Sequence, residues 1–127
     1  MIPGKFTMAL LLLTAPAVWA QYSQADMAKV AADRFDVAAR TLNLRSDQEA
    51  AIKPLIQSKY KDIGQVKDVY RSSDKSDASK KTAKDSLKAI DAKYSGQINA
   101  ILSPEQAKEW KRMQKKDWKD DLILPKS

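Results

Sequence analysis

Two short stretches of sequence, Leu44-Arg45-Ser46-Asp47-Gln48 and Leu102-Ser103-Pro104-Glu105-Gln106, decide how this chain folds. Each stretch closes one apolar helical pattern at a leucine and opens the next. In the second stretch, Ser103 is typical of a helix N-cap, Pro104 suits the first helical position, and Gln106 can complete a capping box. We therefore predict a corner between two helices at each stretch.

The first stretch differs from the second at the capping position. Arg45 stands where the second stretch has Ser103. Ser46 lies one residue later and is followed after three residues by Glu49, which is the spacing of a capping box. We predict that Ser46 caps this helix, and that Leu44 and Gln48 have the same structural role as Leu102 and Gln106.

The pattern outside these stretches predicts an all-α fold, because apolar residues recur at helical spacing and nowhere alternate as in strands. Ser23 is the predicted N-cap of the first helix, and Pro54 should kink the second. A polar break over 71–77 separates the second helix from the third. The four helices are expected at about 24–42, 47–70, 77–102 and 104–119.

The second and third helices are the longest, at about 25 residues and near 38 Å each. Because a short polar break joins them, they should form a long antiparallel hairpin. The shorter first and fourth helices should then fold against its open end. A layer this thin buries little apolar area, so we expect a homodimer.

The N-terminus has the features of an export signal. Lys5 supplies a positive charge, an apolar run follows, and Val18-Trp19-Ala20 places small residues at cleavage positions. We predict cleavage after Ala20, which leaves 21–127 as a single domain that does not span a membrane. The alternative, an uncleaved anchor, is disfavoured because the run is short and Pro16 interrupts it.

The composition excludes several kinds of chemistry. The chain has no Cys and no His, which removes disulfides, thiol nucleophiles, Ser-His triads and the usual zinc ligands. Met27 and Met113 lie on apolar stripes, where a core position is the simpler interpretation. No paired carboxylates, phosphate-binding loop or calcium loop is found, so we expect neither an enzyme, a metal nor a cofactor.

The two stretches, the export signal and the long helical hairpin between them resemble the Spy/CpxP family of periplasmic proteins, which carries two Leu-Thr-x-x-Gln elements. The second stretch matches with Ser103 in place of Thr, whereas the first departs at Arg45. The segments 42–56 and 92–106 are also similar to those of shorter Spy-like relatives, which carry a proline in this helix. The resemblance extends over about 36–114.

This resemblance implies a cradle-shaped antiparallel dimer in the periplasm that works without ATP. The expected function is a chaperone that binds unfolded or partly folded envelope proteins through a basic and apolar surface. The alternative is a regulatory module that restrains the periplasmic domain of an envelope-stress sensor kinase. These two functions would use the same surface, so the sequence leaves both open.

The candidate client-binding residues combine cations with aromatic side chains. The net charge is +7, and basic residues gather on the third and fourth helices. The alternative without a binding function is that the cations form a solvated face and the tryptophans belong to the core. We expect no nucleic-acid partner, because the signal directs the chain to a place where little nucleic acid is met and no nucleic-acid-binding module is found. The candidates are Lys80, Lys84, Lys88, Lys108, Lys111, Arg112, Lys115, Trp110 and Trp118.

Overall fold

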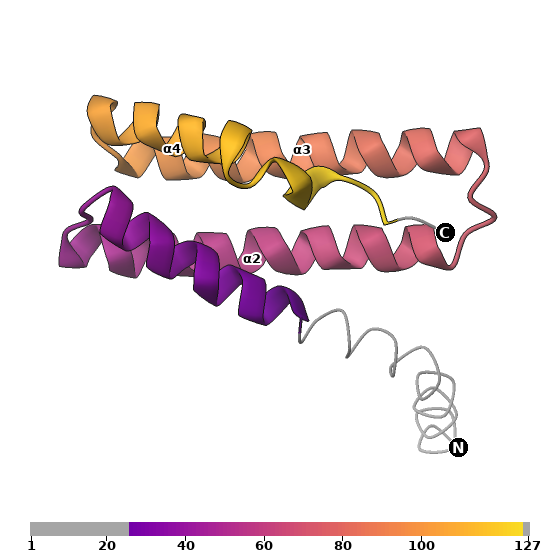
Figure 1. The fold of residues 1–127 in the computed structure, drawn as a ribbon, viewed down its shortest axis with the longest axis horizontal. Coiled ribbons are helices and arrows are strands. Elements are labelled where there is room, and N and C mark those ends of the chain that lie inside the picture. The colour runs from indigo at the N-terminus through magenta and orange to yellow at the C-terminus, as the bar shows by residue number, and fades with distance from the viewer. Residues whose placement is uncertain (1–25, 126–127) are drawn as a thin grey trace, which may run out of the picture.

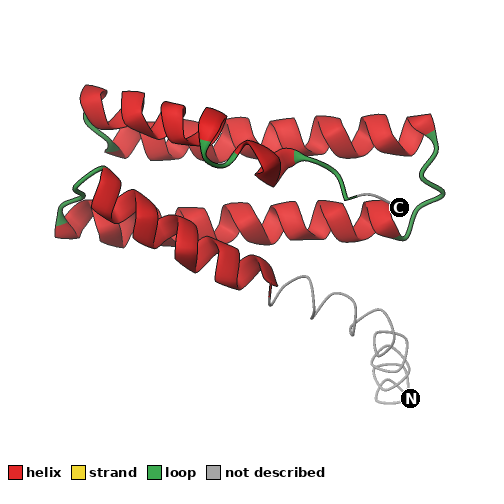
Figure 2. Ribbon diagram, in the orientation of Figure 1, coloured by secondary structure: helices red, strands yellow, loops and turns green. Residues whose placement is uncertain are grey.

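The computed structural model describes residues 26–125, which are helices joined by short loops and contain no strand (Figure 2). This confirms the predicted all-α class with four helices. The predicted signal sequence and the Ser23 cap lie outside the described residues. After an N-terminal helix over residues 26–41 come α2 (Ser46–Arg71), α3 (Asp77–Ile101), α4 (Pro104–Lys116) and the short 3-10 helix η1 (Lys119–Leu122).

The long helices α2 and α3 run antiparallel and form the expected hairpin, with a loop over 72–76 at one end (Figure 1). The N-terminal helix lies along α2 and α4 lies along α3, both toward the open end of the hairpin. Ser76 caps α3, because its hydroxyl accepts a hydrogen bond from the backbone N–H of Ser79 at 3.2 Å. Each long helix is therefore covered over part of its length by one short helix.

The core forms where the apolar stripes of all four helices meet. A few residues on the predicted apolar stripes, such as Met27, Leu55 and Ile90, are only partly buried, whereas most of the stripe residues are buried. The buried residues include Ala31, Phe35, Ala38 and Leu42 from the N-terminal helix, Ile52, Ile56, Tyr60 and Ile63 from α2, Leu87, Tyr94 and Ile98 from α3, and Trp110 and Met113 from α4.

Pro54 lies inside α2, and α4 ends earlier than predicted. α2 continues as one helix through Pro54, which is exposed. A bend of the helix at this residue stays a prediction. α4 ends at Lys116 rather than near Lys119, because Trp118 turns back into the core and η1 follows. Among the described residues, no helix is both long and apolar enough to cross a membrane.

Candidate functional site

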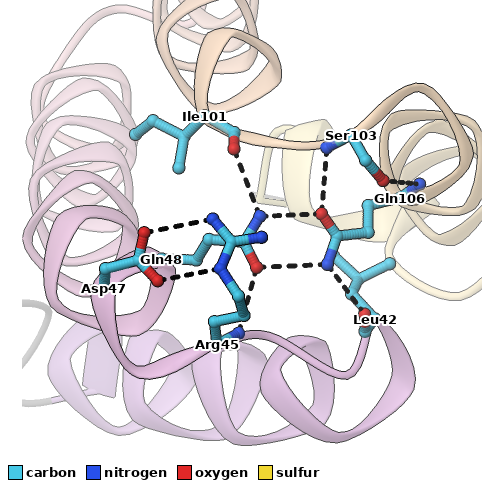
Figure 3. A network of polar contacts seen from close by, with 7 residues as sticks. All are labelled: Leu42, Arg45, Asp47, Gln48, Ile101, Ser103 and Gln106. Carbon is cyan, nitrogen blue, oxygen red and sulfur yellow. Dashed lines mark hydrogen bonds and ion pairs between the residues drawn. The ribbon is translucent and has the colours of Figure 1, made fainter.

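The two repeated stretches meet at the open end of the hairpin, where the side chains of Gln48 and Gln106 bond to each other (Figure 3). Gln48 Nε2 donates to Gln106 Oε1 at 2.8 Å, and Gln106 Nε2 donates to Gln48 Oε1 at 3.2 Å. Gln48 is buried and Gln106 is half-buried, so this exchange is partly shielded from solvent. The pair joins the start of α2 to the start of α4.

Each amide of this pair also bonds to the backbone of a corner. Gln48 Nε2 donates to the carbonyl of Ile101 at 3.2 Å, and Gln106 Nε2 donates to the carbonyl of Leu42 at 3.0 Å. Their Oε1 atoms accept from the backbone N–H groups of Arg45 and Ser103, respectively. Because both amides already bond to protein groups on each side, the corner is a structural lock and offers little to a ligand.

The first corner differs from its prediction. The N-cap of α2 is Arg45 and not Ser46, so the proposed box between Ser46 and Glu49 is wrong. Gln48 must occupy the third helical position to reach Gln106, and there its Oε1 also accepts from the Arg45 N–H. The Arg45 guanidinium instead donates two bonds to the Asp47 carboxylate, at 3.0 and 3.1 Å.

The second corner agrees with its prediction. Ser103 Oγ accepts from the Gln106 N–H at 3.2 Å, Gln106 Oε1 accepts from the Ser103 N–H at 2.9 Å, and Pro104 is the first residue of α4. Leu44 and Leu102 are both buried and belong to the core. The two corners therefore have the same register, with a leucine, a capping residue and, three residues after the cap, a glutamine.

A groove of about 670 Å³ lies between α3 and α4 and continues to η1. Four exposed lysines line it: Lys108, Lys111, Lys115 and Lys119. The first three stand three and four residues apart, which places them on one side of α4. Within residues 26–125, none of the four forms an ion pair. We call this the basic groove.

The basic groove also contacts a buried cation. Lys59 is 3% exposed, and its Nζ lies 3.2 Å from Asp91 Oδ1 and 5.7 Å from the ring centre of Trp110. Burial lowers the pKa of Lys59, and the Asp91 carboxylate opposes that shift. Gln114 Nε2 donates to the same carboxylate at 3.2 Å. In the sequence, Lys59 stood out only as a neighbour of Tyr60 on the apolar stripe.

A second acidic side chain at the basic groove, Asp121, is held by two other elements. Its carboxylate accepts two bonds from the Arg34 guanidinium, at 2.7 and 3.0 Å, and one from the Tyr60 hydroxyl. Burial, and then the Asp121 charge, raise the pKa of Tyr60. We call these three residues the clasp. Its members are far apart in the chain, so no local pattern could have predicted it.

The predicted client-binding cations do not form one cluster. Lys108, Lys111 and Lys115 line the basic groove, whereas Arg112 is paired with Glu109 at 2.6 Å and with Asp117 at 3.6 Å. On α3, the exposed lysines Lys80, Lys84 and Lys88 lie outside the groove.

The two candidate tryptophans belong to the core in this structure. Trp110 is 1% exposed and Trp118 is 7% exposed, and their rings meet edge to face with centres 5.4 Å apart. The Arg34 guanidinium also lies over the Trp118 ring, with its Cζ 5.5 Å from the ring centre. Neither ring therefore provides the exposed aromatic surface that we expected for client binding. Both tryptophans instead occupy core positions, which was the alternative interpretation.

A second groove, of about 720 Å³, lies between α2 and α3 toward the loop end of the hairpin. Its lining is largely apolar and includes Val66, Val69, Tyr70, Ala83 and Ile90. Val69 is 71% exposed, the highest value among the large apolar side chains of residues 26–125. We call this the apolar groove. The sequence did not indicate it, because Val66 and Ile90, which line it, also pack against the core.

The described part of the chain offers surfaces for binding. No group of three or more His, Cys, Asp or Glu side chains within it could hold a metal ion. Comparison with known proteins found no matching family model, no matching curated protein and no matching solved structure. The two corners and the two grooves are therefore the features of the described residues that bear on function.

Proposed function

We propose that this chain is an exported chaperone of the Spy/CpxP type, which binds partly unfolded envelope proteins without nucleotide. The observation that carries the proposal is the apolar groove, where Val69 is 71% exposed on a small helical hairpin. The groove offers apolar contacts to a partner that lies along the hairpin. Weak apolar contacts of this kind suit a client that must be held and then released.

The exposed lysines supply the second part of the mechanism. Lys80, Lys84 and Lys88 stand at intervals of one helical turn on α3, and none of them forms an ion pair within residues 26–125. Their charge would attract acidic segments over a distance limited by salt, to about 8 Å at physiological ionic strength. Capture would then be electrostatic, and retention would be apolar.

The glutamine lock supports the family resemblance. In both repeated stretches the glutamine bonds the N–H of its own cap and the glutamine of the other stretch. This geometry explains why a chain would carry two stretches of the form Leu-x-x-x-Gln with one hairpin between them. Arg45 in place of a hydroxyl residue does not disturb the lock, because the lock needs only the backbone N–H of that residue.

The proposal is tested by the suppression of aggregation of a chemically unfolded protein at stoichiometric amounts, at low and at high salt. Val69→Asp should lower the suppression, because it places a charge in the apolar groove. Ile123→Asp is the matched control, since Ile123 is the other large exposed apolar residue of the described range, at 58%, and does not line that groove. No suppression by the unaltered chain at either salt concentration would refute the chaperone function.

A capture experiment separates this function from regulation. The unaltered chain, immobilised and exposed to an envelope extract, should retain many unfolded proteins. Retention of one folded partner with an acidic surface would instead favour the regulatory module that acts on a sensor kinase. If Val69→Asp abolished the retention of unfolded proteins and of a folded partner alike, both functions would use the apolar groove.

Export and dimerisation are further parts of this proposal. We infer that the signal is cleaved after Ala20 and that two copies associate as an antiparallel cradle. The intact mass of the chain recovered from the periplasmic fraction tests the first inference, and a mass that retains 1–20 would contradict it. Light scattering at micromolar concentration tests the second, and a clean monomer would contradict it.

A further inference from the structure

We propose that the basic groove between α3 and α4 is a binding site for a small ligand with two or more phosphate groups. This site is distinct from the apolar groove, and the inference does not depend on chaperone activity. It rests on three features of the groove: its uncompensated charge, its surplus of hydrogen-bond donors and its size.

The charge of the groove is strongly positive, because its acids are already neutralised. Asp91 is paired with Lys59, and Asp121 is paired with Arg34 and bonded by Tyr60. The four lysines of the groove have no such partners within residues 26–125: Lys108, Lys111, Lys115 and Lys119. Four like charges around one hollow repel each other, and an anion that enters it relieves that repulsion.

The lining of the groove holds donors that protein groups do not fully use. Trp110 lines it, and the Trp110 Nε1 is the one buried side-chain polar atom in the described part of the chain without a hydrogen-bond partner. The Lys59 ammonium has three hydrogens, and Asp91 is its one ion-pair partner among the described residues. Oxygen atoms of a ligand drawn into the groove would satisfy such donors.

Size and charge density favour phosphate over carboxylate. The groove volume of about 670 Å³ lies within the range of small-molecule sites, which is about 300–1,000 Å³. A phosphate ester carries about −1.5 to −2 charges and three acceptor oxygens, whereas a carboxylate carries a single charge. Two phosphates therefore balance four lysines within this volume. Lysine ammonium groups serve well as point charges for phosphate.

The test is a calorimetric titration of pyrophosphate into the full exported chain at low salt, with two triple variants. Lys108→Gln/Lys111→Gln/Lys115→Gln alters the basic groove. Lys80→Gln/Lys84→Gln/Lys88→Gln removes the same charge from exposed positions outside it. The unaltered chain should bind at one saturable site. The groove variant should bind at least about tenfold more weakly, and the control should stay within about twofold.

Equal weakening in both triple variants would overturn the proposal, because it would mean that only the net charge matters. Absence of saturable binding to the unaltered chain would also overturn it. Circular dichroism verifies that both variants fold, which is expected because every altered lysine is exposed. The tryptophans supply a local signal, since Trp110 and Trp118 both line the groove. Pyrophosphate should change their fluorescence in the control variant as it does in the unaltered chain.

Two more probes identify the source of the phosphate. A glutamate-rich peptide with the same net charge as pyrophosphate should bind more weakly, and equal or tighter binding would overturn the assignment to phosphate. Vesicles of phosphatidylcholine with phosphatidic acid test for a lipid headgroup. Binding to these vesicles that pyrophosphate displaces supports a headgroup ligand, whereas pyrophosphate binding without vesicle binding supports a free polyphosphate.

Discussion

Gln48 and Gln106 are the residues on which both corners depend, since each bonds to the other and to two backbone groups. We predict that Gln48→Ala and Gln106→Ala each lower the free energy of unfolding by about 2 kcal/mol, because each leaves buried polar groups unpartnered. The double variant should lose less than the sum of the two by about 1 kcal/mol. Urea denaturation measures all three.

The control for this cycle is Gln97→Ala, which removes an exposed glutamine from α3. Its unfolding free energy should lie within about 0.5 kcal/mol of that of the unaltered chain. Strict additivity of Gln48→Ala and Gln106→Ala would contradict the lock, because independent side chains do not share an interaction energy.

The two serines near the corners should respond differently to alanine. Ser103 caps α4 through its hydroxyl, so Ser103→Ala should lower the unfolding free energy by about 1 kcal/mol. Ser46 is already inside α2 and is exposed, so Ser46→Ala should change the unfolding free energy by less than about 0.5 kcal/mol. Thermal or urea denaturation distinguishes the two. A large loss on Ser46→Ala would show that this serine is the N-cap after all.

At the scale of elements, the two helical glycines differ in what surrounds them. A Cβ at Gly96 in α3 would meet nothing within 4 Å, whereas one at Gly64 in α2 would lie 2.6 Å from Met27 Cγ. Gly96→Ala should therefore raise the unfolding free energy by up to about 1 kcal/mol, through helix propensity alone. Gly64→Ala should gain less, because Met27 must move.

At Gly64, therefore, the Met27 side chain of the N-terminal helix packs close to α2, while Gly96 is a simple weak point of α3. The same denaturation measurement tests both variants. An equal gain from Gly64→Ala and Gly96→Ala would mean that Met27 does not constrain the packing of the two helices. A loss on Gly96→Ala would mean that α3 meets another surface there.

At the scale of the whole molecule, the clasp ties together the N-terminal helix, α2 and η1 through Arg34, Tyr60 and Asp121. Because the folded chain raises the pKa of Tyr60 above its unfolded value near 10.0, the folded chain holds the phenol proton more tightly. The resulting stability is complete below pH 10 and is lost as pH rises above it.

Tyr60→Phe removes this titration. We predict that the variant is less stable than the unaltered chain at neutral pH, by about 1–2 kcal/mol, since a hydrogen bond to a carboxylate is lost. The difference should shrink above pH 10, where the unaltered chain loses the contribution of Tyr60. Urea denaturation at a series of pH values measures the difference, and a constant gap across the series would contradict the raised pKa.

The sequence by itself determined the secondary structure and the hairpin. Helical spacing of residues such as Ile56, Leu87 and Met113 marked which faces are buried, and the polar break over 71–77 marked where the chain reverses. The Ser103 cap was also predictable, because a capping box forms between residues three apart. These features depend on local chemistry, and local chemistry can be read directly from neighbouring residues.

Only the tertiary structure decided how distant residues are used. The register of the first corner follows from Gln106, which holds Gln48 at the third position of α2 and makes Arg45 the cap. Burial of Trp110 and Trp118, the ion pair of Lys59 and the clasp likewise depend on groups far apart in the chain. Packing selects these partners because a buried polar group must find one, and the sequence pattern does not show which group will lie beside it.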